Sequence, residues 1–217
     1  MAKDLAIILN SGSLNSAVIT ALAAQKYRPI MIYAETSAEP ASRAHAAYDQ
    51  QVAHFKPYRE HTLSMPFLSS LHATADAQSV DPRQTGLLPP QMLHLLPLVS
   101  SAVPFAAHYQ AAAIYVGLRV GTSSDDLAQA TEYIQILNEL LQLPCRMSDL
   151  EVMTPLLELE PWQVVDVGFQ VGAPFERAWS CMEESTDPCG ACRGCRDREQ
   201  AFIQAGKPDP VRVARKA

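Results

Sequence analysis

The feature that most constrains this chain is an apolar run that ends in a short polar loop and continues into an alanine-rich stretch. The run, residues 5–9, shows no alternation of apolar and polar positions, which is typical of a strand covered on both faces of a parallel sheet. Residues 17–25 are good helix formers. The sequence therefore predicts a buried strand, a tight loop and a helix over residues 5–25.

The loop between this strand and helix comprises Ser11, Gly12, Ser13, Leu14, Asn15 and Ser16. These residues supply closely spaced backbone N–H groups and hydroxyls at a helix N-terminus, where the helix dipole favours an anion. We therefore expect the loop to bind the phosphate or pyrophosphate of a small-molecule nucleotide. An ordinary strand-to-helix turn capped by Ser or Asn has the same appearance in sequence, so both interpretations stay open at this point.

The rest of the chain alternates strand-like and helix-like segments. We expect strands at residues 29–34, 61–65, 113–118 and one ending at 152–153. We expect helices at 41–55, 91–110, 161–171 and 196–205, and a further helix opened by a polar loop at 121–126. Residues 66–90 predict a long loop, and residues 207–217 a tail. This order implies a Rossmann-like parallel sheet flanked by helices, with a ligand crevice at the carboxyl ends of the strands. We find no repeat or linker and expect one domain over residues 1–217.

Composition restricts the class of partner. The net charge of −6 and the pI near 5.5 disfavour a broad surface for nucleic acid, so we expect a small-molecule ligand and no direct nucleic-acid partner. The N-terminus lacks the pattern of a signal peptide, and the most apolar stretch, residues 92–107, is interrupted by prolines and too short to span a bilayer. We therefore expect a cytoplasmic protein without a membrane partner. The six histidines form no metal-ligand pattern.

Four of the five cysteines lie within residues 181–195: Cys181, Cys189, Cys192 and Cys195. In a reducing compartment this spacing favours a metal over disulfides, and a closed set of four thiolates favours structural Zn²⁺. An iron–sulfur cluster and free thiols are the alternatives. Three arginines, Arg193, Arg196 and Arg198, are placed to offset the charge of the site.

Together, the loop and the cysteine cluster resemble the 7-cyano-7-deazaguanine synthases, the QueC-like family of PP-loop (N-type) ATP pyrophosphatases. The most specific matches are residues 154–156 (TPL), 178–181 (AWSC), the CGxCxxC pattern of residues 189–195, and residues 202–210. The resemblance implies a PP-loop α/β domain with a C-terminal zinc-binding segment at residues 178–206. It also implies ATP and Mg²⁺ as cofactors, and formation of a nitrile from 7-carboxy-7-deazaguanine and ammonia in queuosine biosynthesis.

The chain departs from the family pattern at charged positions. The family loop reads SGGxDS, and this chain has Ser13 in place of a glycine and Asn15 in place of the aspartate. Gln91 and Met92 stand where the family has an Arg-Asn pair, and Pro161 stands where it has a lysine. Because Mg²⁺ prefers anionic oxygen and polyphosphate prefers guanidinium, these changes remove groups that handle ATP.

A further departure concerns the substrate crevice. The family's Asp-containing loop falls on Thr122, Ser123 and Ser124, after Arg119, and we expect all four residues to line the crevice. The favoured hypothesis is a divergent synthase-like protein with weakened, altered or lost activity. The alternatives are an ATP-dependent ligase acting on another substrate, and an inactive zinc-stabilised scaffold that binds nucleotides or proteins. A homodimer is compatible with each.

Overall fold

The computed structural model describes residues 4–36, 42–68, 90–122, 124–145 and 150–213. Most of the long loop expected at residues 66–90 lies outside this part of the chain. The five strands found in the described residues form one parallel sheet in the order β3-β2-β1-β4-β5, which confirms the predicted fold class. The strands are β1 (Leu5–Leu9), β2 (Arg28–Glu35), β3 (Arg59–Ser64), β4 (Ala113–Val116) and β5 (Glu151–Met153). Strand β1 is central, so the topology reverses between β1 and β4, where α/β sheets bind ligands.

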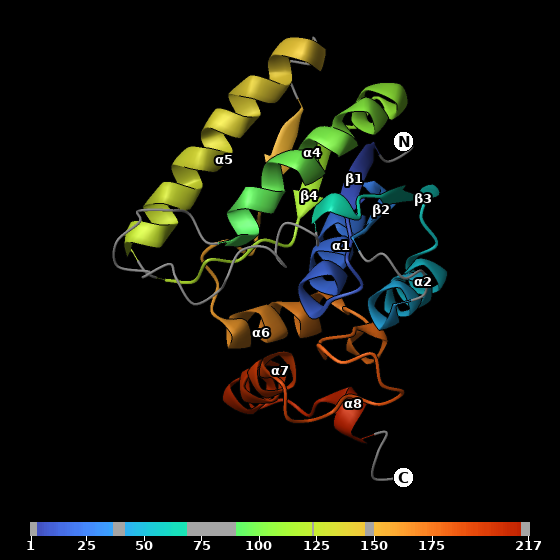
Figure 1. The fold of residues 1–217 in the computed structure, drawn as a ribbon, viewed down its shortest axis with the longest axis vertical. Coiled ribbons are helices and arrows are strands. Elements are labelled where there is room, and N and C mark those ends of the chain that lie inside the picture. The colour runs from blue at the N-terminus through green and yellow to red at the C-terminus, as the bar shows by residue number, and fades with distance from the viewer. Residues whose placement is uncertain (1–3, 37–41, 69–89, 123, 146–149, 214–217) are drawn as a thin grey trace.

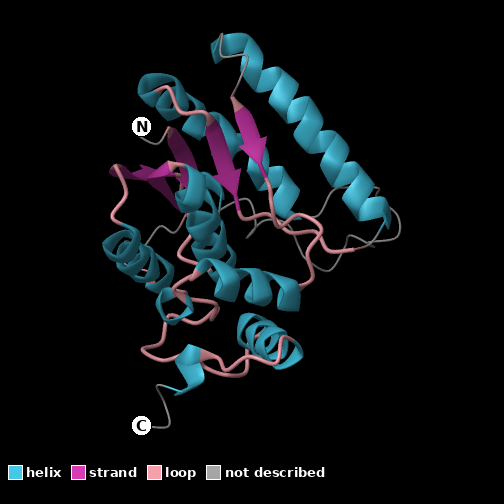
Figure 2. Ribbon diagram, turned by 180° about the vertical axis from the view of Figure 1, so that it is seen from behind, coloured by secondary structure: helices cyan, strands magenta, loops and turns pink. Residues whose placement is uncertain are grey.

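Helices cover both faces of the sheet (Figures 1 and 2). On one face lie α1 (Leu14–Lys26), α2 (Arg43–Phe55) and α6 (Pro161–Val171); on the other lie α4 (Pro90–Tyr109) and α5 (Ser124–Cys145). Successive residues of β1 belong to opposite cores, Ile8 to the first and Ile7 to the second. This double covering explains the unbroken apolar run, because a strand with no solvent face needs no polar positions.

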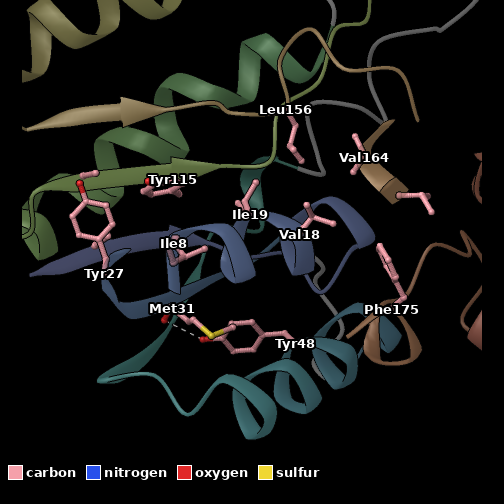
Figure 3. Close-up of a cluster of buried hydrophobic side chains, with 14 of the residues drawn as sticks. Ile8, Val18, Ile19, Tyr27, Met31, Tyr48, Tyr115, Leu156, Val164 and Phe175 are labelled. Carbon is pink, nitrogen blue, oxygen red and sulfur yellow. Dashed lines mark hydrogen bonds between the residues drawn. The ribbon is translucent and has the colours of Figure 1, made fainter. Parts of the chain in front are cut away.

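The first core gathers residues from the sheet, from α1 and from the C-terminal segments. Figure 3 shows Ile8, Val18 and Tyr115 among its members, and the hydroxyl of Tyr48 donates to the carbonyl oxygen of Met31 at 3.1 Å. Among the described helices, none has the length and hydropathy needed to cross a bilayer.

The C-terminal part packs beneath α1 and α2 at the end of the molecule where the chain terminates (Figure 1). It consists of α6, the short helix η1 (Phe175–Arg177), α7 (Arg193–Gln204) and α8 (Pro210–Val213). Helix α6 has the predicted bounds, with Pro161 in its first turn and Gly172 at φ 69° as its stop.

The expectation of an unstructured tail over residues 207–217 is wrong for its first part. Residues 210–213 form α8, and Asp209 is 8 % exposed. Both carboxylate oxygens of Asp209 accept hydrogen bonds from the guanidinium of Arg198, each at 2.8 Å. The segment is ordered by a partner in α7, and local sequence composition does not report such a partner.

Replacing Gly168 with Ala is expected to destabilise the protein by about 1–3 kcal/mol through overpacking. An added Cβ would collide with the buried ring of Phe175 and lie 2.9 Å from Val18 Cγ2. This cost exceeds the gain in helix propensity of about 1 kcal/mol. Urea unfolding measures the change, and Gln170→Ala on the exposed side of α6 is the control. A G168A protein at least as stable as wild type would contradict the packing described here.

Candidate functional site

A cavity of about 520 Å³ opens at the carboxyl ends of β1, β2 and β4, the position predicted for the ligand crevice. The described residues that line it are apolar or neutral polar residues, apart from one arginine and one histidine. The lining residues are Leu9, Asn10, Ser11, Ser13, Asn15, Ser16, Ile32, Tyr33, Ala34, Thr36, Ala44, His94, Leu95, Leu98, Val116, Gly117, Leu118 and Arg119. No carboxylate and no lysine occurs among them.

The polar loop after β1 forms one wall of this cavity and turns sharply into α1. Gly12 has φ 74°, and an added Cβ would collide with the carbonyl oxygen of Ala44, so only glycine fits. Ser13 is the N-cap of α1, and its hydroxyl accepts a hydrogen bond from the N–H of Ser16 at 3.3 Å. The strand, loop and helix are therefore arranged as the sequence predicts.

Half of the loop's backbone N–H groups donate to side chains of the same loop or of its preceding residue. The bonds are Ser11 N to Ser16 Oγ at 3.1 Å, Gly12 N to Asn10 Oδ1 at 2.8 Å, and Ser16 N to Ser13 Oγ at 3.3 Å. Within the described part of the chain, this leaves the N–H groups of Ser13, Leu14 and Asn15 for an anion, as is usual for the first turn of a helix.

The side chain of Asn15 donates a hydrogen bond that an aspartate could not make. Its side-chain amide donates to the carbonyl oxygen of Gly117 at 3.1 Å and ties α1 to the end of β4. An ionised aspartate has no proton to donate and would be repelled by that carbonyl. Asn15 therefore contributes a hydrogen bond to the wall of the crevice and no negative charge.

Of the four residues expected at the substrate crevice, the structure describes the side chains of Arg119 and Thr122, and these two differ. Arg119 lines the cavity, whereas the hydroxyl of Thr122 donates to Glu160 Oε1 at 2.6 Å, at the N-cap of α6. Ser123 lies outside the described residues. Ser124 begins α5, and its side chain is likewise outside the description.

Reasoning from sequence missed polar residues of this region that lie outside the loop itself. His94 lines the cavity from α4, and Asn10 and Gln51 form a buried pair beneath the loop. A polar residue at the end of an apolar run was an available signal for Asn10. No local signal marks Gln51, which lies mid-helix in α2.

The four clustered cysteines converge, as predicted. Their Sγ atoms all lie within 4.8 Å of one another, and those of Cys181 and Cys192 are 3.8 Å apart. Cys192 is the N-cap of α7, so the helix start presents Cys192 and Cys195 together. Backbone N–H groups surround the sulfurs, including those of Glu183 and Cys189, which each donate to Cys181 Sγ at 3.4 Å.

These N–H groups favour thiolates. Donation from the backbone of Met182 and Cys195 lowers the pKa of the Cys192 thiol to about 6. Burial raises the pKa of the Cys195 thiol, because its thiolate form would lose hydration. Four thiolates can share this space only with a cation among them, so the cluster is suited to hold a metal ion.

The predicted role of the three arginines is wrong for Arg198. Arg198 is buried, and its guanidinium pairs with the carboxylate of Asp209, so its charge is already offset. The long side chain of Arg193 pairs with Asp197 at 3.4 Å, and that of Arg196 donates to the carbonyl oxygen of Ala191 in the cysteine loop. Local spacing does not show that a carboxylate distant in sequence, Asp209, already neutralises one of the three arginines.

Comparison with known proteins agrees with this architecture. The family model described as "Queuosine biosynthesis protein QueC" matches residues 5–206. A 7-cyano-7-deazaguanine synthase of Koribacter versatilis is 29% identical over 96% of this chain and 93% of its own length; that of Chloroherpeton thalassium is 26% identical, covering 95% of each chain. The U34-tRNA thiolase NcsA of Methanococcus maripaludis, solved with its [4Fe-4S] cluster, shares the fold at TM-score 0.50 and 13% identity, covering 99% of this chain and 72% of NcsA. Because the family model matches almost the whole chain, and the fold and the cysteine cluster agree with it, this chain belongs to the QueC family.

Proposed function

We propose that this chain is a divergent QueC-family protein that binds a nucleotide in the crevice and has lost most or all nitrile-forming turnover. The observation that carries the proposal is the charge of the cavity. Its described lining contains the single guanidinium of Arg119 and no carboxylate. The ligand class is a small-molecule nucleotide or a deazapurine-like base.

The physical reason is the difference between binding and catalysis. Neutral N–H groups at a helix N-terminus bind a phosphate in its ground state. Phosphoryl and adenylyl transfer require extra stabilisation of charge in the transition state, which Mg²⁺ and positioned cations provide. Loss of one such contact costs about 10²–10³ in rate, and this crevice lacks several of those found in the family pattern.

The test is a reaction of the purified chain with ATP, Mg²⁺, ammonia and 7-carboxy-7-deazaguanine. Product is followed by mass spectrometry, and AMP and pyrophosphate are followed in parallel. We expect ATP binding without detectable nitrile, under conditions where the Koribacter versatilis relative serves as the positive control. Robust nitrile formation by the unmodified chain would overturn the proposal. Release of AMP and pyrophosphate with a different acid would instead favour a ligase with another substrate.

Restoring the loop motif alone is expected to be insufficient. The double variant Ser13→Gly, Asn15→Asp returns the glycine and the carboxylate of the family loop but leaves Gln91 and Pro161 unchanged. It also breaks the bond from Asn15 to Gly117. We expect nitrile formation to stay below detection in the same mass-spectrometric assay. Recovery of activity by this variant would show that the loop by itself limits turnover.

ATP affinity is expected to depend only weakly on Mg²⁺, changing by less than about threefold between EDTA and millimolar Mg²⁺. The reason is that hard cations need anionic oxygen ligands, and the described lining of the cavity contributes none. Isothermal titration calorimetry measures the change. A steep rise in affinity with Mg²⁺ would contradict the expectation and direct attention to Glu35, Asp125 or Asp126.

We propose zinc as the metal of the cysteine cluster, with a structural role. Four thiolates around one tetrahedral zinc ion stand about 3.8 Å apart, given Zn–S bonds of about 2.3 Å. The 3.8 Å between Cys181 and Cys192 fits this geometry. In a cubic iron–sulfur cluster each thiolate binds a different iron, so the sulfurs stand farther apart. All four positions around the ion are taken by protein, which favours a structural ion over a Lewis acid.

A further inference from the structure

The phosphate loop and the segment that leads into the cysteine cluster lie far apart in the sequence and are joined by hydrogen bonds. The backbone N–H of Trp179, two residues before Cys181, donates to the carbonyl oxygen of Gly12 at 3.0 Å. Cys181, a member of the cysteine cluster, is therefore only two residues from a hydrogen bond to the phosphate loop.

Gln51 of α2 makes a second connection at the same place. Its side chain is fully buried, and its Oε1 accepts a hydrogen bond from Asn10 Nδ2 at 2.9 Å. Its Nε2 donates to the carbonyl oxygen of Gly12 at 3.0 Å and to that of Arg177 at 3.2 Å. One buried amide thus spans the loop and the segment that leads to the cysteines.

The segment at residues 175–179 is also held from the side of the cluster. Arg198, three residues after Cys195, donates to the carbonyl oxygens of Phe175 and Ala178, each at 2.9 Å. When Cys195 and Cys181 share a metal ion, the position of α7 relative to this segment is set at both ends. The hydrogen bonds to the carbonyl oxygen of Gly12 then fix the phosphate loop relative to the same segment.

The geometry of the peptide bond explains why this matters for an anion. The carbonyl of Gly12 and the N–H of Ser13 belong to the same trans peptide, so they point in opposite directions. Two inward donors, from Trp179 and Gln51, hold the carbonyl toward the protein interior. The N–H of Ser13 is thereby directed to the other side, where the cavity lies.

We propose that Gln51 is a positioning residue through which metal binding at the cysteine cluster sets the conformation of the phosphate loop. The consequence for ligands rests on the proposed nucleotide binding, whereas the effect on the loop does not. By thermodynamic linkage, an anion bound at the loop must strengthen metal retention by the same factor by which the metal strengthens anion binding.

The direct test is hydrogen exchange of the loop peptide containing residues 11–16, with and without Zn²⁺. In the wild type, removal of Zn²⁺ with a chelator is expected to speed exchange of this peptide by about tenfold, within the usual range of couplings between sites. In Gln51→Met, exchange should already be fast with Zn²⁺ bound and change by less than twofold on its removal. Gln50→Met, at the exposed neighbouring position of α2, is the matched control and should behave as wild type.

A second readout follows linkage in the other direction. Release of Zn²⁺ to a coloured chelator is timed with and without ATP, and ATP should slow release by about tenfold in the wild type and Q50M but not in Q51M. A loop whose exchange is indifferent to Zn²⁺ in the wild type, or coupling that is equal in Q51M and Q50M, would overturn the inference. If exchange responds to Zn²⁺ as expected but ATP has no effect on release in the wild type, the coupling stands and the proposed nucleotide binding fails.

Discussion

Cys192→Ala is expected to abolish stoichiometric metal binding and unfold the segment around the cysteines. Residues 182–187 are exposed and contribute little to either apolar core, so the metal supplies most of the free energy that orders them. Binding of a structural zinc ion is worth about 10–16 kcal/mol in small zinc domains, and that energy is folding energy. Elemental analysis and limited proteolysis between residues 180 and 195 measure the two losses.

Met182→Ala is the control for this substitution. The side chain of Met182 is 71% exposed, and the contact of Met182 with the cluster is made by its backbone N–H, which the substitution retains. M182A should keep one metal ion per chain and resist proteolysis as wild type does. Freshly purified wild-type protein without stoichiometric zinc would overturn the assignment of the metal, whatever the behaviour of the variants.

Arg198→Met is expected to lower the free energy of unfolding by about 3–5 kcal/mol. The substitution preserves much of the side-chain volume but leaves the carboxylate of Asp209 without its cation in a site where it is 8% exposed. It also removes donors from the carbonyl oxygens of Phe175 and Ala178. Equilibrium unfolding in urea with Zn²⁺ present measures the difference.

Two variants separate this mechanism from a general effect of losing a positive charge. Arg193→Met breaks an exposed pair with Asp197 and should cost less than about 0.5 kcal/mol. Adding Asp209→Leu to Arg198→Met should recover part of the lost stability, since the uncompensated charge is removed. An R198M protein as stable as R193M would contradict the role given to the buried pair.

Local patterns predicted the elements of this fold well. The run at residues 5–9 required cover on both faces, and a parallel sheet provides it. Pro161 and Gly172 marked the two ends of α6 at the right residues. The spacing of the cysteines predicted their convergence, because ligands separated by two residues can meet only through tight turns. In each case the signal and its cause lie within a few residues of each other.

The long-range hydrogen bonds and ion pairs between these elements could not be predicted in the same way. Gln51 bonds to Asn10 over 41 residues and to Arg177 over 126. Arg198 looked like a counter-ion for the cluster and is instead the partner of Asp209, which orders a segment that composition alone suggested was a tail. A buried hydrogen bond depends on which surfaces the fold brings together, and sequence spacing carries no information about that.

The phosphate loop shows both kinds of information in one place. Its residues alone imply a strand-to-helix turn with N–H groups at a helix N-terminus. Only packing against α2 and residues 177–179 determines which of those groups face the cavity, because donors from Gln51 and Trp179 fix the carbonyl of Gly12. Short-range periodicity and spacing therefore specify the loop, whereas burial against distant segments specifies the direction of its dipoles and so its chemistry.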